Sequence, residues 1–512
     1  MNKSVFKITS RGSKLKIGIF LLAPVLFTYI IFFVELDPSN SSIAYTLAVA
    51  ILMALWWATE VVPLAITSLL PLILFPVLGI MNGKDVSSTY FNHVIFLFIG
   101  GFLVALAIQR WDLHKRIALK ILLTVGVSPG RILLGFMLGT AFLSMWISNT
   151  ATTMLMIPIL LSIISKLEDI NSKKRVKQFS IGLLLSIAYS ASIGGIATLV
   201  GTPPNLSFVR IFNIYFEEAP EISFASWFFY AIPIVVIMII ISWFYLYLVF
   251  VKGRKRWKNI GKSTIKAEYQ SLGKWSYEEV ILSIIFVTMA LLWFFRVDIN
   301  IGSYTIYGWS NLFEHPKYFN DGTVAILMAT SLFLIPSQKK KGKFLMNWKT
   351  AKKIPWEIIL LFGGGFALAT GFKESGLSLW IGEQLVWLKD IHPIVIILTI
   401  AIVISFLTEL TSNTATVETF LPVLAGLAMS IQINPLLFML PATIAGSLAF
   451  MLPVATPPNA IVFGTKRLKV IDMSRTGFIL NIIGILIVTL STYYLATYIF
   501  NIDINTYPYW AK

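Results

Sequence analysis

Long apolar runs dominate the chain, and short polar or basic segments separate them. Many of these runs approach or exceed the length of about 18 residues that marks a candidate membrane-spanning helix. The pattern predicts an all-α polytopic membrane protein of about 11 transmembrane helices. We expect these helices at 17–34, 43–57, 62–80, 94–109, 179–200, 228–251, 279–296, 322–337, 355–372, 436–454 and 476–500.

Two further apolar stretches, 131–167 and 394–431, are interrupted near their middle by the polar tripeptide Ser-Asn-Thr. The tripeptide lies in "WISNTATT" (146–153) and again in "LTSNTATV" (410–417). The loop charges alternate consistently only if each stretch leaves and re-enters on one side of the membrane. We therefore predict two re-entrant hairpins with the tripeptides at their tips, since non-helical backbone is tolerated there only inside protein or beside water.

The two halves of the chain repeat one another. "LFIGGFLVALAIQ" (97–109) matches "LFGGGFALATGFK" (361–373) at an offset of 264, and Ser148 matches Ser412 at the same offset. "GTPPN" (201–205) matches "ATPPN" (455–459). Because the first hairpin enters from the cytoplasm and the second from outside, the repeats are predicted to be inverted. The predicted parts are 1–90, with three helices; 91–252, the first repeat core; 253–354, a connection; and 355–512, the second repeat core.

The charge pattern supports this topology. Only 13% of the 512 residues are charged, and 41 Lys and Arg against 24 Asp and Glu give a net charge of +17. Most basic residues fall in the N-terminus, 109–131, 165–178, 252–274, 338–354 and 464–475, which alternation places on one side. This asymmetry marks the cytoplasmic side and argues against nucleic-acid binding, although contact with anionic lipids fits it. The N-terminus is then cytoplasmic and the C-terminus outside.

The paired motifs carry the chemistry. Each Pro-Pro pair removes two backbone donors and should break its helix, which frees carbonyl groups. Such carbonyls, with Ser, Thr and Asn oxygens, suit Na⁺, while helix N-termini attract an anion. Hydroxyl groups that bond back to their own helix, and prolines that only kink it, are the alternative. The recurrence of both motifs in both halves favours a binding site in a secondary transporter.

The other charged and polar residues limit the functions that the protein can have. The hairpin arms and broken helices are expected to lack Lys and Arg away from their cytoplasmic ends, so an anionic substrate needs bound cations beside it. Glu409 is either a buried acid with a polar partner or a group that tunes a cation site; Glu418 has no account from the sequence. The four His residues show no metal-ligand spacing, and no ATP-binding motif is present.

With "SNTATT", "GTPPN", "LTSNTAT" and "ATPPNAIVFG" in this order, the chain resembles the divalent anion/sodium symporter family over nearly its whole length. The resemblance implies import of C4-dicarboxylates such as succinate, malate and fumarate with at least two Na⁺ ions. It also implies a homodimer in which a transport domain moves like an elevator against a scaffold domain.

The resemblance implies two sodium sites and a substrate site between the hairpin tips. The first sodium site is carried over onto Ser144, Ser148, Asn149 and the carbonyl of Gly201; the second onto Thr408, the carbonyl of Thr411, Asn413 and the carbonyl of Ala455. The substrate carboxylates are expected at Ser148, Asn149, Thr150, Ser412, Asn413 and Thr414, with Thr202, Thr456 and Pro457 nearby.

Other functions remain open at this point. The family includes exchangers that swap dicarboxylates without sodium, and tricarboxylates such as citrate, or sulfate, are alternative substrates. An anion channel fits two opposed hairpins poorly, and a membrane enzyme lacks a catalytic constellation. A chain without cysteine and without processing signals indicates a bacterial plasma membrane.

Overall fold

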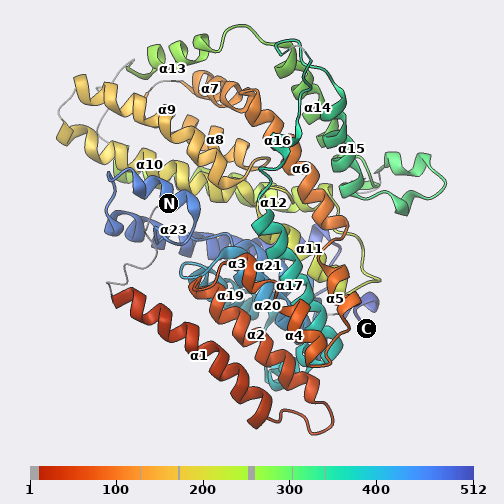
Figure 1. Ribbon diagram of the computed structural model, residues 1–512. Coiled ribbons are helices and arrows are strands. Elements are labelled where there is room, and N and C mark those ends of the chain that lie inside the picture. Colours follow the sequence, from red (N-terminus) through yellow and green to blue (C-terminus); the bar gives the residue numbers. More distant parts are fainter. Residues whose placement is uncertain are drawn as a thin grey trace, which may run out of the picture.

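The structure is a computed structural model that describes residues 11–126, 128–170, 173–251, 260–301, 304–340, 342–504 and 506–512. The predicted basic N-terminus (1–10) and part of the predicted basic loop at 252–274 lie outside these residues. The described chain is largely helical (Figure 1), and its one named strand pair, β1 (Ile299–Ile301) and β2 (Tyr304–Ile306), is antiparallel. The prediction of a helical protein is confirmed.

The first part of the chain forms six helices. They are α1 (Arg11–Phe33), α2 (Ser41–Thr59), α3 (Leu64–Thr67), α4 (Leu70–Val77), α5 (Gly83–Thr89) and α6 (His93–Arg110). Helix α1 runs along one edge of the molecule beside α2 (Figure 1). The predicted helix 62–80 is divided into α3 and α4, because Pro71 cannot donate a backbone hydrogen bond and restarts the helix at its first turn.

The next part builds a layer of long helices. They are α7 (Leu113–Val125), α8 (Pro129–Ser144), α9 (Asn149–Ile170), α10 (Lys173–Gly195), α11 (Pro203–Tyr215), α12 (Phe224–Leu246) and the π-helix η1 (Tyr247–Val251). Helices α8 and α9 form a hairpin around the first Ser-Asn-Thr motif, and both pack on α10 (Figure 1). The segment 109–131, expected to be a loop, contains α7, whose apolar face is buried and whose Arg116 pairs with Glu279 at 2.7 Å.

The middle of the chain connects the two halves. It contains α13 (Ile260–Ser271), α14 (Tyr277–Phe294), the strands β1 and β2, the 3-10 helices η2 (Trp309–Leu312) and η3 (Pro316–Tyr318), α15 (Asp321–Leu334) and α16 (Trp348–Ala351). Helix α15 packs along α6, so this connection lies against the first part of the chain.

The last part repeats the order of the layer. It contains α17 (Trp356–Ser375), α18 (Leu377–Gln384), η4 (Val386–Asp390), α19 (Pro393–Leu407), α20 (Asn413–Ile431), α21 (Leu436–Ala445), α22 (Pro457–Gly464), α23 (Val470–Leu490), η5 (Ser491–Ala496), α24 (Thr497–Ile499) and η6 (Tyr509–Ala511). Helices α19 and α20 flank the second Ser-Asn-Thr motif in the middle of the molecule (Figure 1).

The order of helices in the two halves of the chain is similar, while the inverted relation of the halves stays a prediction. Helices α6, α8 and α9 correspond to α17, α19 and α20, and the broken pair α10–α11 corresponds to α21–α22. The repeats also exchange contacts, since α20 packs on α11 and α9 packs on α22. The two broken helices end earlier than predicted, at Gly195 instead of 200 and at Ala445 instead of 454, because the irregular backbone between their halves is longer than the Pro-Pro pair alone requires.

Nine helical stretches in the described part of the chain are long and apolar enough to cross a membrane. They are Ser41–Thr59, Gly83–Arg110, Asn149–Asp169, Val176–Gly195, Phe224–Val251, Tyr277–Phe294, Trp356–Ser375, Asn413–Ile431 and Val470–Ile499. Two of them are second arms of the hairpins, whereas α15 and α21 are shorter than a full span. The count of about 11 transmembrane helices therefore stays a prediction.

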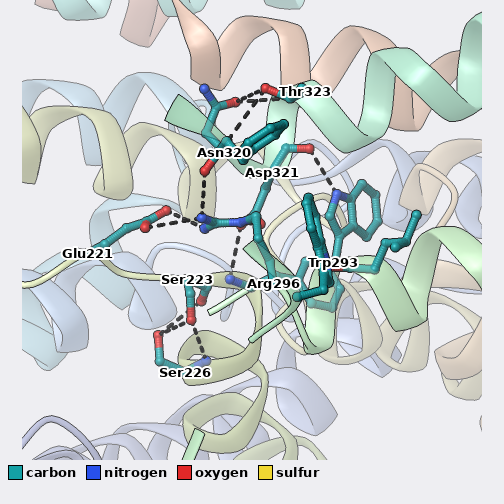
Figure 2. Close-up of polar contacts among 12 residues, drawn as sticks. Glu221, Ser223, Ser226, Trp293, Arg296, Asn320, Asp321 and Thr323 are labelled. Carbon is teal, nitrogen blue, oxygen red and sulfur yellow. Dashed lines mark hydrogen bonds and ion pairs between the residues drawn. The ribbon is translucent and has the colours of Figure 1, made fainter. Parts of the chain in front are cut away.

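A buried ionic cluster joins three segments of the fold (Figure 2). Arg296 follows α14, is 1% exposed, and donates from Nε to Asp321 Oδ1 at 2.6 Å at the start of α15. Its other nitrogens bond Glu221, which precedes α12, and the Phe319 carbonyl. The second Asp321 oxygen accepts the Phe224 amide at 3.1 Å, so α12, α14 and α15 are held at one point.

Replacing Arg296 should destabilise the protein strongly. In Arg296→Met, Asp321 would keep a buried carboxylate without a counter-charge, and removing one partner of a buried pair costs about 3–5 kcal/mol. Thermal unfolding of the purified protein in detergent should show a clear loss of stability. Lys373→Met is the matched control, because Lys373 and Glu217 are 34% and 76% exposed and solvent-exposed pairs contribute about 0–1 kcal/mol. Equal shifts in both variants would contradict this account.

Candidate functional site

The four paired motifs all lie where a helix begins. The first hairpin resumes as α9 at Asn149 and the second as α20 at Asn413. The second halves of the broken helices begin at Pro203 and Pro457, with Thr202 and Thr456 as the preceding caps. The prediction that each Pro-Pro pair interrupts its helix is confirmed. Four helix N-termini, each with a partial positive charge, thus lie beside irregular backbone. The two that begin with Pro-Pro, α11 and α22, have no amide hydrogen at their first two positions.

Three oxygen atoms gather at the end of the first hairpin arm. The hydroxyl of Ser144 lies 2.5 Å from Asn149 Oδ1 and 2.7 Å from the carbonyl oxygen of Ala191 in α10. A serine hydroxyl has one proton to donate, yet both neighbours are acceptors. With the Asn149 amide in this orientation, one oxygen–oxygen contact has no proton between its atoms. Such a cluster is suited to a cation.

Gly195 leaves room for this cluster. A Cβ atom at this position would lie 2.7 Å from Asn149 Oδ1 and 3.1 Å from the carbonyl oxygen of Gly201. The amide of Asn149 and the carbonyl of Gly201 therefore face one point across the broken helix α10–α11. The structure brings together three of the four residues that were predicted for the first sodium site, Ser144, Asn149 and Gly201.

The second hairpin repeats the arrangement. The hydroxyl of Thr408 lies 2.6 Å from Asn413 Oδ1 and 3.1 Å from the carbonyl oxygen of Gly446, which follows α21. Again one hydroxyl proton faces two acceptors. Thr408 and Asn413 of the predicted second sodium site are thus in contact. The Thr411 hydroxyl bonds the Leu407 carbonyl and the Thr416 hydroxyl. The predicted roles of the Thr411 and Ala455 carbonyls stay predictions.

The asparagines of the two Thr-Pro-Pro-Asn motifs hold the broken backbone. Asn205 Nδ2 donates to the carbonyl oxygens of Gly195, Ile196 and Thr198 at 3.3, 3.3 and 2.8 Å. Asn459 Nδ2 donates to the carbonyls of Ala449 and Leu452, both at 3.0 Å. Both side chains are fully buried, and each Oδ1 has no hydrogen-bond partner among the described residues. The sequence motifs contain these asparagines, but sequence analysis did not predict a role for them.

Glu409 stabilises the break in the second half. Its carboxylate accepts the backbone amides of Phe450, Met451 and Leu452 at 2.7–3.0 Å and the side-chain amide of Asn481 at 2.8 Å. In the first half the position at the same offset is Met145, whose carbonyl accepts the Thr198 hydroxyl. Glu409 is therefore the buried acid with polar partners, the first of the two interpretations that the sequence left open.

The remaining predicted site residues surround the helix starts. Ser148 accepts the Ala151 amide at 3.3 Å, and Thr456 accepts the Asn459 amide at 3.3 Å. Thr202, Thr414 and Thr456 are buried, and Pro457 is exposed. Ser148, Thr150 and Ser412 are partly exposed. These residues cap or flank the four N-termini, and no contact given by the structure joins the two tips directly.

One expectation about charge is wrong. The first half of the broken helix, α10, ends before the predicted end at 200, but its second half, α11, continues to Tyr215 and carries Arg210. Glu217, beyond the end of α11, is an acid whose charge acts on this guanidinium, and Arg210 Nε has no hydrogen-bond partner among the described residues. The hairpin arms themselves have no Lys or Arg between Arg131 and Lys166 or within α19 and α20.

A cavity of about 280 Å³ lies beside the Arg296 cluster and not at the motifs. Its lining includes His93, Asn213, Glu221, Lys317 and Asp321. None of the predicted site residues lines it.

Comparison with known proteins agrees with these features. Residues 16–500 match the family model described as the sodium:sulfate symporter transmembrane region. The chain is 42% identical over 490 residues to the sodium-dependent dicarboxylate transporters SdcS of Staphylococcus saprophyticus and Staphylococcus aureus, covering 95% of this chain and 92% of theirs.

Two solved structures share the fold at low sequence identity. Neisseria gonorrhoeae MtrF is 12% identical with a TM-score of 0.52, covering 95% of both chains. The YdaH transporter of Alcanivorax borkumensis is 12% identical with a TM-score of 0.50, covering 95% of this chain and 98% of its own. The match over nearly the whole chain, with the repeated motifs at four helix starts, shows that this multi-pass membrane protein belongs to the sodium:sulfate symporter family, the divalent anion/sodium symporters.

Proposed function

We propose that the protein imports C4-dicarboxylates such as succinate, malate and fumarate across a bacterial plasma membrane, driven by Na⁺. The observation that carries the proposal is the pair of oxygen clusters, Ser144 with Asn149 and Thr408 with Asn413, in which one hydroxyl proton faces two acceptors. The relatives at 42% identity are sodium-dependent dicarboxylate transporters, which supports the same cation and substrate class.

At least two Na⁺ ions are co-transported in this proposal. The first is held by Ser144, Ser148, Asn149 and the Gly201 carbonyl, and the second by Thr408, Asn413 and the carbonyls of Thr411 and Ala455. Hard cations prefer oxygen ligands, and irregular backbone at midplane supplies them in secondary transporters.

The substrate carboxylates bind between the two tips in this proposal. Each tip begins a helix, so the amides at Asn149–Thr150 and Asn413–Thr414 offer partial positive charge, and Ser148, Ser412, Thr202, Thr456 and Pro457 complete the surroundings. The hairpin arms contain no lysine or arginine near the tips, so the dianion is neutralised by the sodium ions. Substrate binding then depends on prior sodium binding, and this dependence couples the two fluxes.

The movement follows from the same arrangement. We propose that the two hairpins and broken helices form a transport domain that moves like an elevator against a scaffold of the remaining helices. The repeats are inverted, the protein is a homodimer, the N-terminus is cytoplasmic and the C-terminus outside. The parts are 1–90, 91–252, 253–354 and 355–512. The basic segments of the sequence support this orientation through the positive-inside rule.

Uptake into proteoliposomes tests the function. Radiolabelled succinate should accumulate with an inward Na⁺ gradient and not with an equal K⁺ gradient. Two ions and a dianion cross without net charge, so a tenfold Na⁺ gradient supports accumulation up to about 100-fold, since each 1.4 kcal/mol is a factor of ten. Uptake that ignores Na⁺ but requires unlabelled dicarboxylate inside would instead identify an exchanger.

The two asparagines should each be necessary for coupling. Asn149→Ala and Asn413→Ala remove one oxygen of each cluster, and each should lower Na⁺-driven uptake by about tenfold or more, equivalent to about 1.4 kcal/mol. Asn213→Ala, in the cavity beside the Arg296 cluster, is the matched control and should retain uptake. Normal Na⁺ dependence in both tip variants would exclude these sites.

Gly195→Ala should weaken the first sodium site without changing a ligand. The added methyl group would lie 2.7 Å from Asn149 Oδ1 and displace the amide. Half-maximal uptake should then need a higher Na⁺ concentration. Gly464→Ala is the control, because a Cβ atom there meets nothing within 4 Å. Unchanged Na⁺ dependence in Gly195→Ala would argue against a cation at this point.

A further inference from the structure

Glu418 is a buried acid that the sodium and substrate sites do not use. It lies in α20, five residues after Asn413, and its side chain is 0% exposed. One carboxyl oxygen, Oε1, lies 2.7 Å from the Ser207 hydroxyl in α11. The other, Oε2, has no hydrogen-bond partner among the described residues. The contact between α20 and α11 joins the second hairpin to the first broken helix.

The unpartnered oxygen faces a different helix. A Cβ atom at Gly365 of α17 would lie 2.4 Å from both Glu418 Oε2 and the carboxyl carbon. The glycine therefore makes room for the carboxyl group, and any larger residue would displace it. Gly365 belongs to the repeated segment "FGGGF". A Cβ atom at either of the other two glycines would likewise clash, with Tyr90 at Gly363 and with Ser68 at Gly364. Glu418 thus lies at the contact between α17 and the α11–α20 pair.

No counter-charge accompanies this acid. In the described chain Glu418 forms no ion pair, whereas Arg116, Arg296 and Arg467 all do. Seven helices of the described chain pack on α20, and two of them, α19 and α21, have no ionisable residue. The ionisable residues of the other five are Tyr45 (α2), Arg210 and Tyr215 (α11), Glu357, Lys373 and Glu374 (α17), Glu383 (α18), and Lys389 and Asp390 (η4). None of these bonds Glu418. Lys373 bonds Glu217, and Tyr215 bonds the Ala369 carbonyl.

The repeat shows that the position does not require an acid. At the offset of 264 the first hairpin has Met154, which is 58% exposed. The counterpart of Ser207 in the second broken helix is Ile461. Apolar residues, Met154 and Ile461, occupy the positions that correspond to Glu418 and Ser207. The acid and its hydroxyl partner are therefore additions to the repeated framework.

We propose that Glu418 is a proton-binding site, and that its proton exchanges with water when α20 moves past α17. A buried carboxylate with one hydrogen bond and no cation is costly, whereas a carboxylic acid that donates to the Ser207 hydroxyl is neutral. The inference rests on the proposed elevator transport. In that movement Glu418 leaves Gly365, and the acid releases H⁺ as a carboxylate and rebinds it on return.

The site predicts a specific pH dependence. Above neutral pH the substrate stays a dianion, so any fall in uptake reports on the protein. Loss of the proton would leave a bare carboxylate against Gly365, and Na⁺-driven uptake by the wild type should fall as the medium becomes alkaline. Glu418→Gln is permanently neutral and should keep its uptake over this range. Thr419→Val, whose hydroxyl bonds only its own helix, should keep the wild-type profile.

The experiment uses the full chain in proteoliposomes, with Na⁺-driven succinate uptake from neutral to alkaline pH. The infrared spectrum of the same samples at neutral pH should show the carbonyl band of a protonated acid that Glu418→Gln lacks. If Glu418→Gln does not fold, Glu418→Met, which copies the other repeat, replaces it. An absent band, or a mutant whose uptake falls with pH as in the wild type, overturns the proposal. Failure of Na⁺-driven uptake in every sample, with the band present, overturns the sodium-coupled function instead.

Discussion

The structure depends on one constraint: a backbone polar group buried in the membrane must find a partner within the protein. The two broken helices leave several carbonyl and amide groups without helical partners, and buried side chains supply the bonds. Asn205 and Asn459 each satisfy carbonyls of the irregular segment between the two half-helices, and Glu409 satisfies three amides in the second break. The interruptions that a binding site requires are stable because these few polar side chains were placed beside them.

The oxygen atoms that lack a hydrogen-bond donor at the two tips explain the proposed sodium binding. Ser144 and Thr408 each offer one proton to two oxygen atoms, so one oxygen–oxygen contact at each tip has no proton between its atoms. A sodium ion stabilises that contact without a fixed positive side chain. Because the positive charge comes with the ion, a dianion meets a favourable field only after sodium has bound. Coupling is then a consequence of electrostatics at the tips and needs no separate gating device.

The sequence predicted the features that depend on periodicity and repetition. The duplicated Ser-Asn-Thr and Thr-Pro-Pro-Asn motifs located both helix breaks, because residue types at matched positions constrain local geometry. The grouping of Ser144 with Asn149 was implied only by the family resemblance. Other features depend on tertiary contacts and were not predictable. Glu409 has its role because the amides of residues 450–452 turn toward its carboxylate. The carboxyl group of Glu418 fits only because Gly365, about fifty residues earlier in the chain, has no side chain. Arg210 was missed because the span was predicted to end at 200, whereas α11 continues to Tyr215.

The two halves are alike in framework and unlike in detail. Glu409 replaces Met145, and Glu418 with Ser207 replaces Met154 with Ile461. Each substitution puts an acid into the second hairpin where the first has an apolar residue. In the proposed inverted arrangement the two tips oppose each other, and these differences make the second hairpin chemically unlike the first.

The most direct test of the central claim is a cryo-electron microscopy map of the reconstituted protein with Na⁺ and succinate. The account predicts density for the dicarboxylate between the starts of α9 and α20, with ion density at Ser144–Asn149 and Thr408–Asn413. Density for succinate in the cavity beside Arg296, with both tips unoccupied, would contradict it.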